Sequence, residues 1–378
     1  MLLALQSDHA DRFNVVHLAS FWHRAGKLVR GSRSDRSAFL GLQYVPARLA
    51  TLRAVPQTGP RELTALAWGA ASASVDSTTW PELWAALSAH AQLLLLHEDE
   101  PTPSPSRQQL QQEPPQDPPQ QGRFTSQGLS NTAWALAKAR HVDADLFHAL
   151  ARVIARRAAE FNPQELSNIA WAFATVGHVD VAMLDAVAAE ATARLPSFQP
   201  QGLSNIGWAF AKLGHRCPVL FEALSALVVL RAGSFKPQEQ SNVAWAFATA
   251  GQPTGASRAA AFDAVGAQAL RCIGQFTSQG MVNLVWSHAT VGHANTQLFD
   301  ALACRMVAEP DRFATQGLSN TAWAFATAEH PAPQLFDVIA KLACHSSQLM
   351  RPQEMSNLLW CAELTRFFHI RGTRVTTV

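Results

Sequence analysis

The sequence predicts an all-α fold, an α-solenoid of stacked αα-hairpins that each span about 37 residues. Three observations predict it: a tryptophan returns at a nearly constant interval, its neighbours recur with it, and each interval holds two helical stretches. The recurring residues are Trp134, Trp171, Trp208, Trp245, Trp286, Trp323 and Trp360, which are separated by 37, 37, 37, 41, 37 and 37 residues.

Each recurring tryptophan belongs to a longer motif. Glutamine lies seven residues before it and asparagine three residues before it in all seven copies. Two examples are Gln164, Asn168 and Trp171, and Gln201, Asn205 and Trp208. Because these residue types do not change between copies, they favour a structural role, in which tryptophan packs between repeats and the amides tie loop backbones together.

The first helix of each hairpin has clear start and stop signals. We expect it to span residues 163–176 in the second copy, because proline at the first helical position loses no intrahelical hydrogen bond. Gly177 suits the position just past the end of this helix. We expect the second helix to span residues 181–194, where apolar residues follow a helical spacing.

The first helix divides into an apolar and a polar face. With successive residues about 100° apart, Leu166, Ile169 and Phe173 fall on the apolar face. The polar face contains Gln164, Ser167, Asn168, Trp171 and Thr175. This position of the tryptophan allows a second interpretation, in which the motif faces a groove where single-stranded nucleic acid stacks and forms hydrogen bonds.

Two positions vary between copies and are our candidates for contact with RNA, since positions that read different bases should differ. The position four residues after the tryptophan carries Lys138, Thr175, Lys212, Thr249, Thr290 and Thr327. The position two residues before the glutamine includes Asn162, Gln199, Lys236 and Arg351. The alternative for both positions is a solvated helix end or a cap.

The period also divides the chain into regions. Residues 123–365 form the seven-copy array, whose last copy is incomplete, and residues 59–98 form a degenerate repeat with helices at 60–68 and 81–96. We expect the four extra residues near 251–257 to lie in an inter-helix turn. The other regions are 1–58, an N-terminal segment read as a transit peptide or a decayed repeat, 99–122, a Pro/Gln-rich linker, and 366–378, a C-terminal tail or cap.

Composition argues against several classes of protein. The net charge is only +2, which is weak support for a phosphate-binding surface. The five scattered cysteines contain no Cys-x-x-Cys pair and are expected to be reduced thiols. No apolar stretch is long enough for a transmembrane helix. Phosphate-loop, zinc-protease and hydrolase motifs do not occur in the sequence.

A histidine recurs in the turns, but its spacing does not favour a metal site. Equivalent residues of stacked helices stand about 8–10 Å apart, whereas zinc–nitrogen bonds are about 2.0–2.1 Å long. We therefore expect no metal, no cofactor and no catalytic residues, and we expect each histidine to bond free carbonyls at the end of its first helix. These residues are His141, His178, His215, His293 and His330.

The unit Phe-x-Pro-Gln-Glu-Leu-Ser-Asn-x-Ala-Trp-Ala-Phe-Ala resembles the octotricopeptide and heptatricopeptide repeats of algal and protist organelle RNA factors. These families are relatives of the FAST-kinase-domain mitochondrial proteins, and many members carry a RAP domain, which is not visible here. The resemblance is strong over residues 123–365 and weak over 60–98. It implies binding of single-stranded organellar RNA, with base contacts on the first helix of each repeat.

Together the residues and the resemblance predict a non-catalytic RNA-binding protein. The resemblance implies a role in RNA processing, stability or translation in the mitochondrion or chloroplast. The expected partners are single-stranded organellar RNA and other proteins of a ribonucleoprotein complex, without a membrane. The alternative is an α-solenoid scaffold for protein–protein interaction, which the near-zero net charge and the uniform first helices favour.

Overall fold

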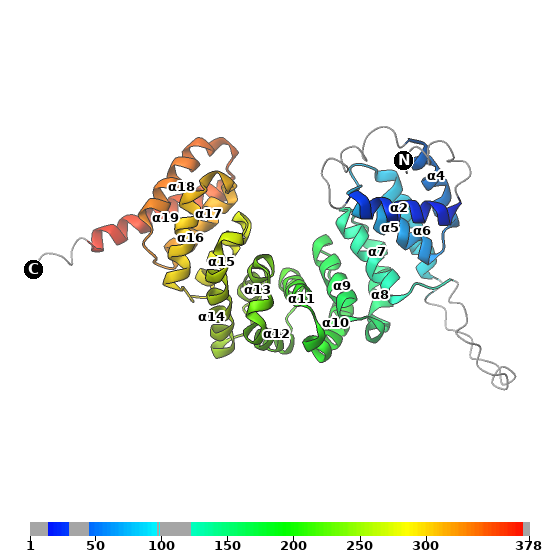
Figure 1. Ribbon diagram of the computed structural model, residues 1–378, viewed down its shortest axis with the longest axis horizontal. Helices are drawn as coiled ribbons and strands as arrows, with labels where there is room; N and C mark the ends of the chain where they lie inside the picture. The colour runs from blue at the N-terminus through cyan, green and yellow to red at the C-terminus, as the bar shows by residue number, and fades with distance from the viewer. Residues whose placement is uncertain (1–13, 30–44, 97, 99–121, 373–378) are drawn as a thin grey trace, which may run out of the picture. The chain divides into compact units, whose positions relative to one another are not determined.

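Helices pack in series in the computed structural model of the chain, which describes residues 14–29, 45–96, 98 and 122–372 (Figure 1). Within these ranges every regular element is helical and no strand occurs. Pairs of helices form hairpins that stack on the next pair, so the predicted all-α solenoid is confirmed. The chain divides into two compact units, Met1–Ala193 and Arg194–Val378.

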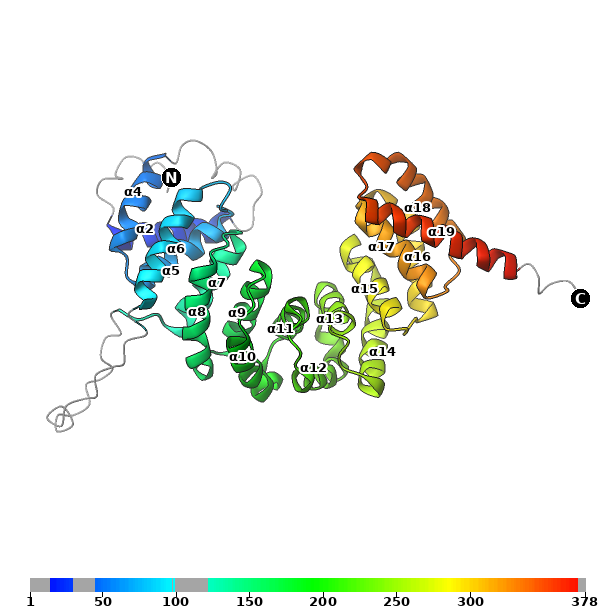
Figure 2. The same ribbon diagram turned by 180° about the vertical axis from the view of Figure 1, so that it is seen from behind.

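The N-terminal unit has two layers of helices (Figure 2). The first-helix layer consists of α2 (Val15–Val29), α5 (Pro60–Ser72), α7 (Ser126–Lys138) and α9 (Pro163–Val176). The second-helix layer consists of α4 (Val45–Ala54), α6 (Pro81–Leu96), α8 (Ala144–Arg156) and α10 (Val181–Arg194). Helix α2 packs on α5, α5 on α7 and α7 on α9, while α4 packs on α6 and α6 on α8.

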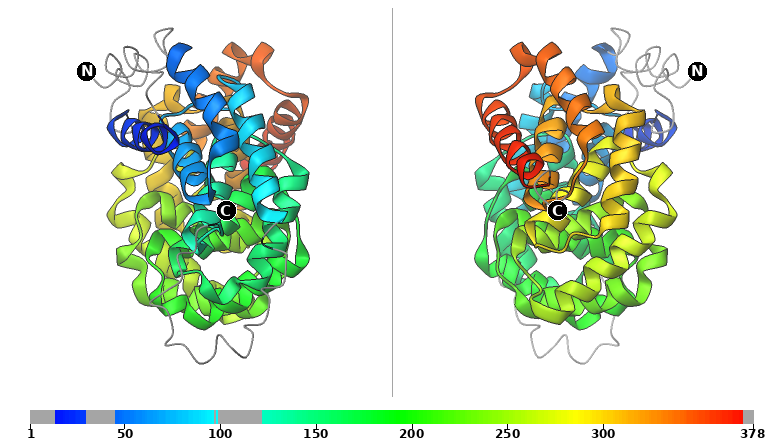
Figure 3. Two further views of the ribbon diagram at one scale, coloured as in Figure 1. Left: turned by 90° about the vertical axis from the view of Figure 1, so that its right-hand side faces the viewer. Right: turned by 90° about the vertical axis from the view of Figure 1, so that its left-hand side faces the viewer.

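The C-terminal unit repeats this arrangement. Its first-helix layer consists of α11 (Pro200–Leu213), α13 (Pro237–Ala250), α15 (Ser278–Thr290), α17 (Thr315–Thr327) and α19 (Pro352–Gly372). Its second-helix layer consists of α12 (Pro218–Arg231), α14 (Gly255–Arg271), α16 (Thr296–Ala308) and α18 (Pro333–His345). Each helix packs on the next of its own layer, and α17 packs on both α18 and α19, which are coloured orange to red in Figure 3.

The helix boundaries follow the start and stop signals. Helices α9 and α10 have the predicted bounds, and Gly177 adopts a left-handed φ of 77° at the end of α9. The expected place of the insertion is wrong. The turn between α13 and α14 is no longer than the turn after α9, whereas α14 has 17 residues and α12 has 14. Three of the four extra residues thus lengthen α14 by about one helical turn, and Cys272 separates α14 from the 3₁₀ turn that follows it.

Short 3₁₀ turns follow the second helices and were not predicted. Five of them lead into the phenylalanine that opens the next copy, and Phe161, Phe198 and Phe235 are buried there, whereas Thr58 and Met350 follow the first and the last of these turns. Such turns tighten a helix end and fix the path of the chain. They are η3 (Val55–Gln57), η5 (Ala158–Glu160), η6 (Leu195–Ser197), η7 (Ala232–Ser234), η8 (Ile273–Gln275), η9 (Pro310–Arg312) and η10 (Ser347–Leu349).

The predicted apolar face is buried, but the polar face is narrower than predicted. Leu166, Ile169 and Phe173 are fully buried. Ser167, which the helical wheel places on the polar face, is also buried. The neighbouring first helix covers this edge, and in an equivalent position the Ser130 hydroxyl donates to the carbonyl of Glu165 on that helix at 3.3 Å. Ser241 and Ser319 form the same link between first helices, whereas the Ser167 and Ser204 hydroxyls donate to carbonyls of their own helices.

Two of the five turn histidines, His293 and His330, also link hairpins. The ring Nε2 of His293 lies 2.8 Å from the carboxylate of Asp263 on the preceding second helix, and His330 makes the same contact with Asp300. The expected contact of these rings with free carbonyls is not what the structure shows. The backbone N–H groups of His293 and His330 satisfy those carbonyls instead. The imidazole rings of His293 and His330 instead contact the preceding hairpin through Asp263 and Asp300.

Helix α2 packs on α5 through a close contact of two glycines. A Cβ atom on Gly69 would lie 2.4 Å from the backbone of Trp22, and one on Gly26 would lie 2.7 Å from the carbonyl of Gly69. The Trp22 indole N–H donates to Thr51 at 2.9 Å and joins α2 to the α4 segment. Helices α2 and α4 thus form a helical pair that packs on the next hairpin, while the transit-peptide interpretation stays a prediction.

Three predicted regions lie partly outside the described residues, namely 1–58, 99–122 and 366–378. The Pro/Gln-rich linker at 99–122 falls outside them except for Gly122. Helix α19 continues to Gly372 and so enters the region expected to be a tail or cap. Among the described helices, none has the length and apolar character needed to cross a membrane.

Helix ends provide a first test of the fold. Glu329 occupies the place of Gly177 in its copy and adopts a φ of 51°, a conformation that costs a side chain about 1 kcal/mol. We expect Glu329→Gly to raise the free energy of unfolding by about 1 kcal/mol in urea unfolding. Gly177→Ala, the matched control, should lower it by a similar amount. Equal stability of all three proteins would contradict the assigned helix ends.

A buried histidine provides a second test. His288 takes the place of the core phenylalanine, its Nδ1 lies 2.9 Å from the Leu284 carbonyl, and its Nε2 has no partner. Burial lowers its pKa from 6.5 to about 4. Between these values the unfolded chain binds the proton and the folded chain does not, so stability is present above pH 6.5 and is lost on acidification.

Replacing this histidine should remove that part of the pH dependence. From pH 7 to 5 the native protein should lose about 2 kcal/mol that His288→Phe does not lose. Urea unfolding at both pH values measures the difference. The exposed His148→Gln is the control and should behave as the native protein. An identical acid loss in His288→Phe and the native protein would show that His288 is not buried in the neutral form.

Candidate nucleic-acid interface

The motif residues form one stripe along each first helix. Glutamine, asparagine, tryptophan and the position four residues later are spaced by four, three and four residues, so they share one face. In α11 this stripe is Gln201, Asn205, Trp208 and Lys212. Because first helices pack side by side within each unit, neighbouring stripes face the same side. We call the resulting surface of each unit the amide–indole ladder.

Exposure along the stripe is the same in nearly every copy. The motif asparagines and tryptophans are half-buried, apart from the exposed Trp360. The glutamines are all exposed, namely Gln127, Gln164, Gln201, Gln238, Gln279, Gln316 and Gln353. The asparagines are Asn131, Asn168, Asn205, Asn242, Asn283, Asn320 and Asn357. The ladder is therefore a surface that a ligand can reach.

The amides of the ladder lack partners inside the protein. In the six copies from α7 to α17, the motif Gln and Asn side chains form no hydrogen bond with any described residue, and none of their amide atoms is fully buried. In α19 the Gln353 amide donates to Asn357 at 3.2 Å. The expected role of these amides in tying loops is thus not observed. Each free amide can donate and accept hydrogen bonds with a ligand.

Arginine holds the loops in place of the amides. The Arg231 guanidinium at the end of α12 donates to the carbonyls of Pro196 at 2.7 Å and Phe198 at 3.3 Å. Arg157 donates in the same way to the Phe124 carbonyl at 2.9 Å. Sequence reasoning missed this role, although these two arginines stand at the same place in their copies.

The tryptophans contact one another across neighbouring helices. Ring centroids lie 6.5 Å apart for Trp134 and Trp171, and 6.4 Å apart for Trp208 and Trp245, with the planes tilted by 33° and 38°. Trp286 and Trp323 form the same contact at 6.4 Å. This confirms packing between repeats, and the half-exposed rings also give aromatic surface on which bases can stack.

The variable position after the tryptophan is mostly open to solvent. Lys212 lies over the Trp208 ring with its Nζ 4.7 Å from the centroid, a cation–π contact. The Thr290 hydroxyl donates to the Trp286 carbonyl, and Thr175 is half-buried. The exposed residues at this position are Lys138, Lys212, Thr249, Thr290 and Thr327.

The variable position before the glutamine is the N-cap of each first helix. The Asn162 side chain accepts a hydrogen bond from the Glu165 N–H at 3.0 Å, so in this copy the residue is a cap. Gln199 and Lys236 are exposed and make no side-chain cap. Arg351 is exposed as well. These three side chains can reach a ligand at the start of their helices.

Carboxylates are kept away from the ladder. On the first helices from α7 to α17 the acidic residues are Glu165 and Glu239, which are buried and accept hydrogen bonds from the N-cap backbone. The basic residues there include Lys138 and Lys212. The ladder is therefore neutral to weakly basic, with amides and indoles in place of the continuous positive stripe that phosphate binding alone would need.

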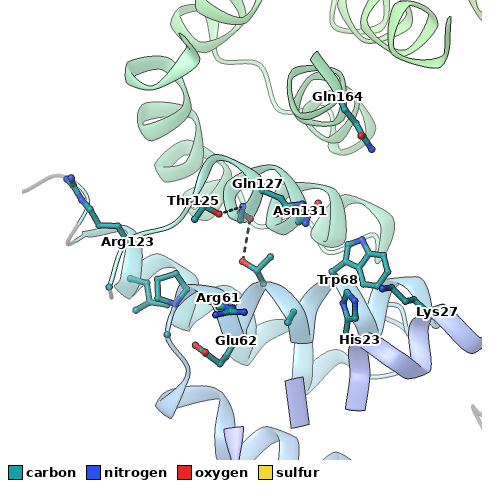
Figure 4. A pocket seen from close by; sticks show the side chains of 17 residues that line it. His23, Lys27, Arg61, Glu62, Trp68, Arg123, Thr125, Gln127, Asn131 and Gln164 are labelled. Carbon is teal, nitrogen blue, oxygen red and sulfur yellow. Dashed lines mark hydrogen bonds between the residues drawn. The ribbon is translucent and has the colours of Figure 1, made fainter. Parts of the chain in front are cut away.

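A cavity of about 1170 Å³ interrupts the ladder in the N-terminal unit (Figure 4). It lies where α2, α5, α7 and α9 contribute side chains, and it was not predicted. In α5 the motif glutamine is replaced by Arg61 and the asparagine by Ala65. His23 stacks on Trp68 with centroids 4.8 Å apart, so α2 supplies a histidine where the other helices supply tryptophan.

The sequence matches the model of a known protein family. The family model described as RNA-editing substrate-binding complex 6 protein matches residues 119–371, about two thirds of the chain. The match covers the helices from α7 to α19. No curated protein matches the sequence significantly.

The free amides lead to a stability test. We expect Asn205→Ala and Asn242→Ala to change the free energy of unfolding by less than about 0.5 kcal/mol, because no intramolecular hydrogen bond is lost. Ser241→Ala is the contrast. Its hydroxyl donates to Gly280 on the next first helix at 3.1 Å, and its loss should cost about 1 kcal/mol. Asparagine variants as unstable as Ser241→Ala would show that the amides serve the fold.

Proposed function

The chain belongs to the family of RNA-editing substrate-binding complex 6 proteins, and from this premise we propose that it binds single-stranded RNA through the amide–indole ladder. The protein holds the strand and does not transform it. The family's description names a complex that binds substrates of RNA editing. A member of such a complex needs a surface for RNA and contacts with other proteins.

One observation carries the proposal: the repeated Gln and Asn amides are accessible and unpaired beside half-exposed indoles. Single-stranded RNA is held by stacking of bases on aromatic rings and by hydrogen bonds to base edges. Each stripe offers both, and the repeat supplies roughly one base site per hairpin, as in other helical-repeat readers of RNA. An unchanging stripe holds any base, so discrimination falls to the variable positions.

The variable positions add charge and selectivity. Lys138, Lys212 and Lys236 lie at the ends of the stripes and are placed to meet phosphates. The exposed Thr249 and Thr327 hydroxyls can accept or donate a hydrogen bond to a base. With so few cations, binding should depend only moderately on salt.

The remaining features of the proposal follow the resemblance to octotricopeptide and heptatricopeptide proteins. We place the protein in an organelle, the mitochondrion or chloroplast, where it acts in RNA processing, stability or translation. RNA editing, named in the family description, is one such form of processing. The partners are organellar RNA and proteins of a ribonucleoprotein complex, and neither a cofactor nor a catalytic residue takes part.

The second candidate function is a scaffold for other proteins, and the near-neutral ladder favours it. Free asparagine amides also suit the backbone of an extended peptide, which has one donor and one acceptor at each residue other than proline. Pull-down with and without nuclease separates the two functions. Partners that are lost with the RNA support RNA binding, and partners that survive support a scaffold.

Isosteric charge changes test the ladder directly. We expect the double variant Asn205→Asp/Asn242→Asp to weaken binding of a single-stranded oligonucleotide by at least about tenfold, or about 1.4 kcal/mol, because each new carboxylate repels phosphate. Gln297→Glu/Gln334→Glu adds the same charge to exposed sites on α16 and α18 and should change binding little. Gel shift or fluorescence anisotropy measures both. Equal losses in the two variants would place the RNA elsewhere.

Salt dependence provides an independent measurement on the same oligonucleotide. Each phosphate contact on a single strand contributes about −0.7 to the slope of log Kobs against log salt. Lys138, Lys212, Lys236 and Arg351 together should give a slope of about −3 or shallower. Lys212→Ala should reduce it by roughly 0.7, whereas Lys341→Ala on α18 should not. A slope that Lys212→Ala does not alter would contradict contact of this stripe with phosphate.

A further inference from the structure

We propose that the cavity in the N-terminal unit is a nucleotide site, which holds a terminal, phosphate-bearing nucleotide of the RNA strand. The inference rests on the proposed function, since the strand is the one that the ladder holds. It goes further by assigning the place of a strand end. The argument starts from the way the cavity differs from the other stripes.

The cavity arises where the motif fails. In every other first helix from α7 to α19 the place of Ala65 is held by asparagine and the place of Arg61 by glutamine. Alanine lacks the carboxamide group of asparagine, so the opening beside α5 is wider by that group. The opening is about 1170 Å³, which exceeds the range of about 300–1,000 Å³ typical of small-molecule sites. A nucleotide fits within it, with room for the adjoining chain.

The floor of the cavity supplies an aromatic surface. Trp68 and His23 stack at 4.8 Å and are both half-exposed. Burial and the nearby Lys27 charge lower the pKa of His23, which favours the neutral imidazole. A neutral aromatic pair of this kind suits stacking of a base. Base edges would then meet the free amides of Gln127 and Asn131 on α7.

Cations stand at both ends of the stacking surface. Lys27 lies beside Trp68 in Figure 4, and Arg61 lies two helical turns from Trp68, about 10 Å along the axis of α5. Both side chains are exposed, and no described residue pairs with either. One cation can therefore bind a terminal phosphate while the other meets the next phosphate along the strand.

The opposing charge in the cavity is Glu62. It occupies the same third helical position as the buried Glu165 and lies beside Gly59 at the start of its own helix. Lys27, Arg61 and Arg123 outnumber it, although Arg123 also lies 3.7 Å from the carboxylate of Glu98. The cavity lining thus carries more positive charge than the stripes of the ladder, where the amides are neutral. This difference indicates a phosphate-rich end of the ligand.

The repeat itself supplies the variants for the test. Arg61→Gln and Ala65→Asn convert the cavity residues to those of every other copy, so the fold should tolerate them. Arg61→Gln removes the charge, and Ala65→Asn places an amide side chain in the opening beside Trp68. Lys341→Gln removes one charge from exposed α18 and is the matched control. Thermal unfolding by circular dichroism checks that the full-length variants are folded.

The experiment compares fluorescence anisotropy of three internally labelled 12-residue oligouridylates, with a 5′-phosphate, a 3′-phosphate or no terminal phosphate. We expect one phosphorylated form to bind at least fivefold more tightly than the form without phosphate. Arg61→Gln and Ala65→Asn should abolish this preference, so that each variant binds all three oligonucleotides with equal affinity. The control should keep the preference. Equal affinity of all three oligonucleotides for the native protein would overturn the assignment to a strand end.

Titration with uridine 5′-monophosphate alone separates this proposal from the proposed function. If calorimetry detects binding of the monophosphate and Arg61→Gln abolishes that binding, the cavity is a nucleotide site. If no oligonucleotide binds in the same set of experiments, only RNA binding by the ladder is refuted. Binding of the free nucleotide without any preference for a phosphorylated strand would assign the site to a free nucleotide instead of a strand end. Absence of both the preference and millimolar binding of the monophosphate would refute the site.

Discussion

The structure depends on the packing of each first helix against the next one in its unit. No hairpin can bury its apolar face alone, so neighbours must supply the missing contacts. Small residues at the contact, such as Ala170 and Gly207, let the helices approach, and phenylalanines fill the space toward the second layer. This contact sets the register between stripes. Once it is made, tryptophans of neighbouring helices meet in pairs, such as Trp208 with Trp245, and the amides of each unit face the same side.

The same packing decides which polar groups are used within the fold. Serine on the edge of the stripe is drawn into the contact, where Ser241 bonds the backbone of the next helix. Arginine at the end of the second helix ties the loop of the preceding copy, as Arg231 shows. The asparagine and glutamine amides are used by neither, although they recur without change. A residue type that recurs without an internal partner is best explained by a ligand that also recurs along its length.

Much of this architecture could be predicted from the sequence. The tryptophan period, the prolines and Gly177 placed the helix ends correctly because these signals act locally. The insertion near residue 251 was misplaced because an added helical turn and a longer loop have the same length in sequence. Ser167 was assigned to the polar face because a helical wheel describes one helix alone and omits the neighbouring helix that buries this residue. Whether the motif Gln and Asn amides bond a loop backbone or remain without a partner depends on where the adjacent copy lies, which only the structure shows.

The N-terminal cavity lay further beyond sequence reasoning. The exchanges at Arg61 and Ala65 were visible as departures from the motif, but they read only as signs of a decayed repeat. Their consequence depends on α2, whose His23 and Lys27 come from a segment without a recognisable motif. Loss of the consensus there opened a space and added charge. Positions where a copy departs from the repeat motif can therefore form a binding site that the other copies lack.

Photo-crosslinking of a 4-thiouridine oligonucleotide to the full-length protein, followed by mass spectrometric mapping, tests the central claim most directly. The account predicts crosslinks on first-helix peptides of several copies, at or next to the motif tryptophans and asparagines. Crosslinks confined to second-helix peptides, such as those of α12 and α16, would contradict it.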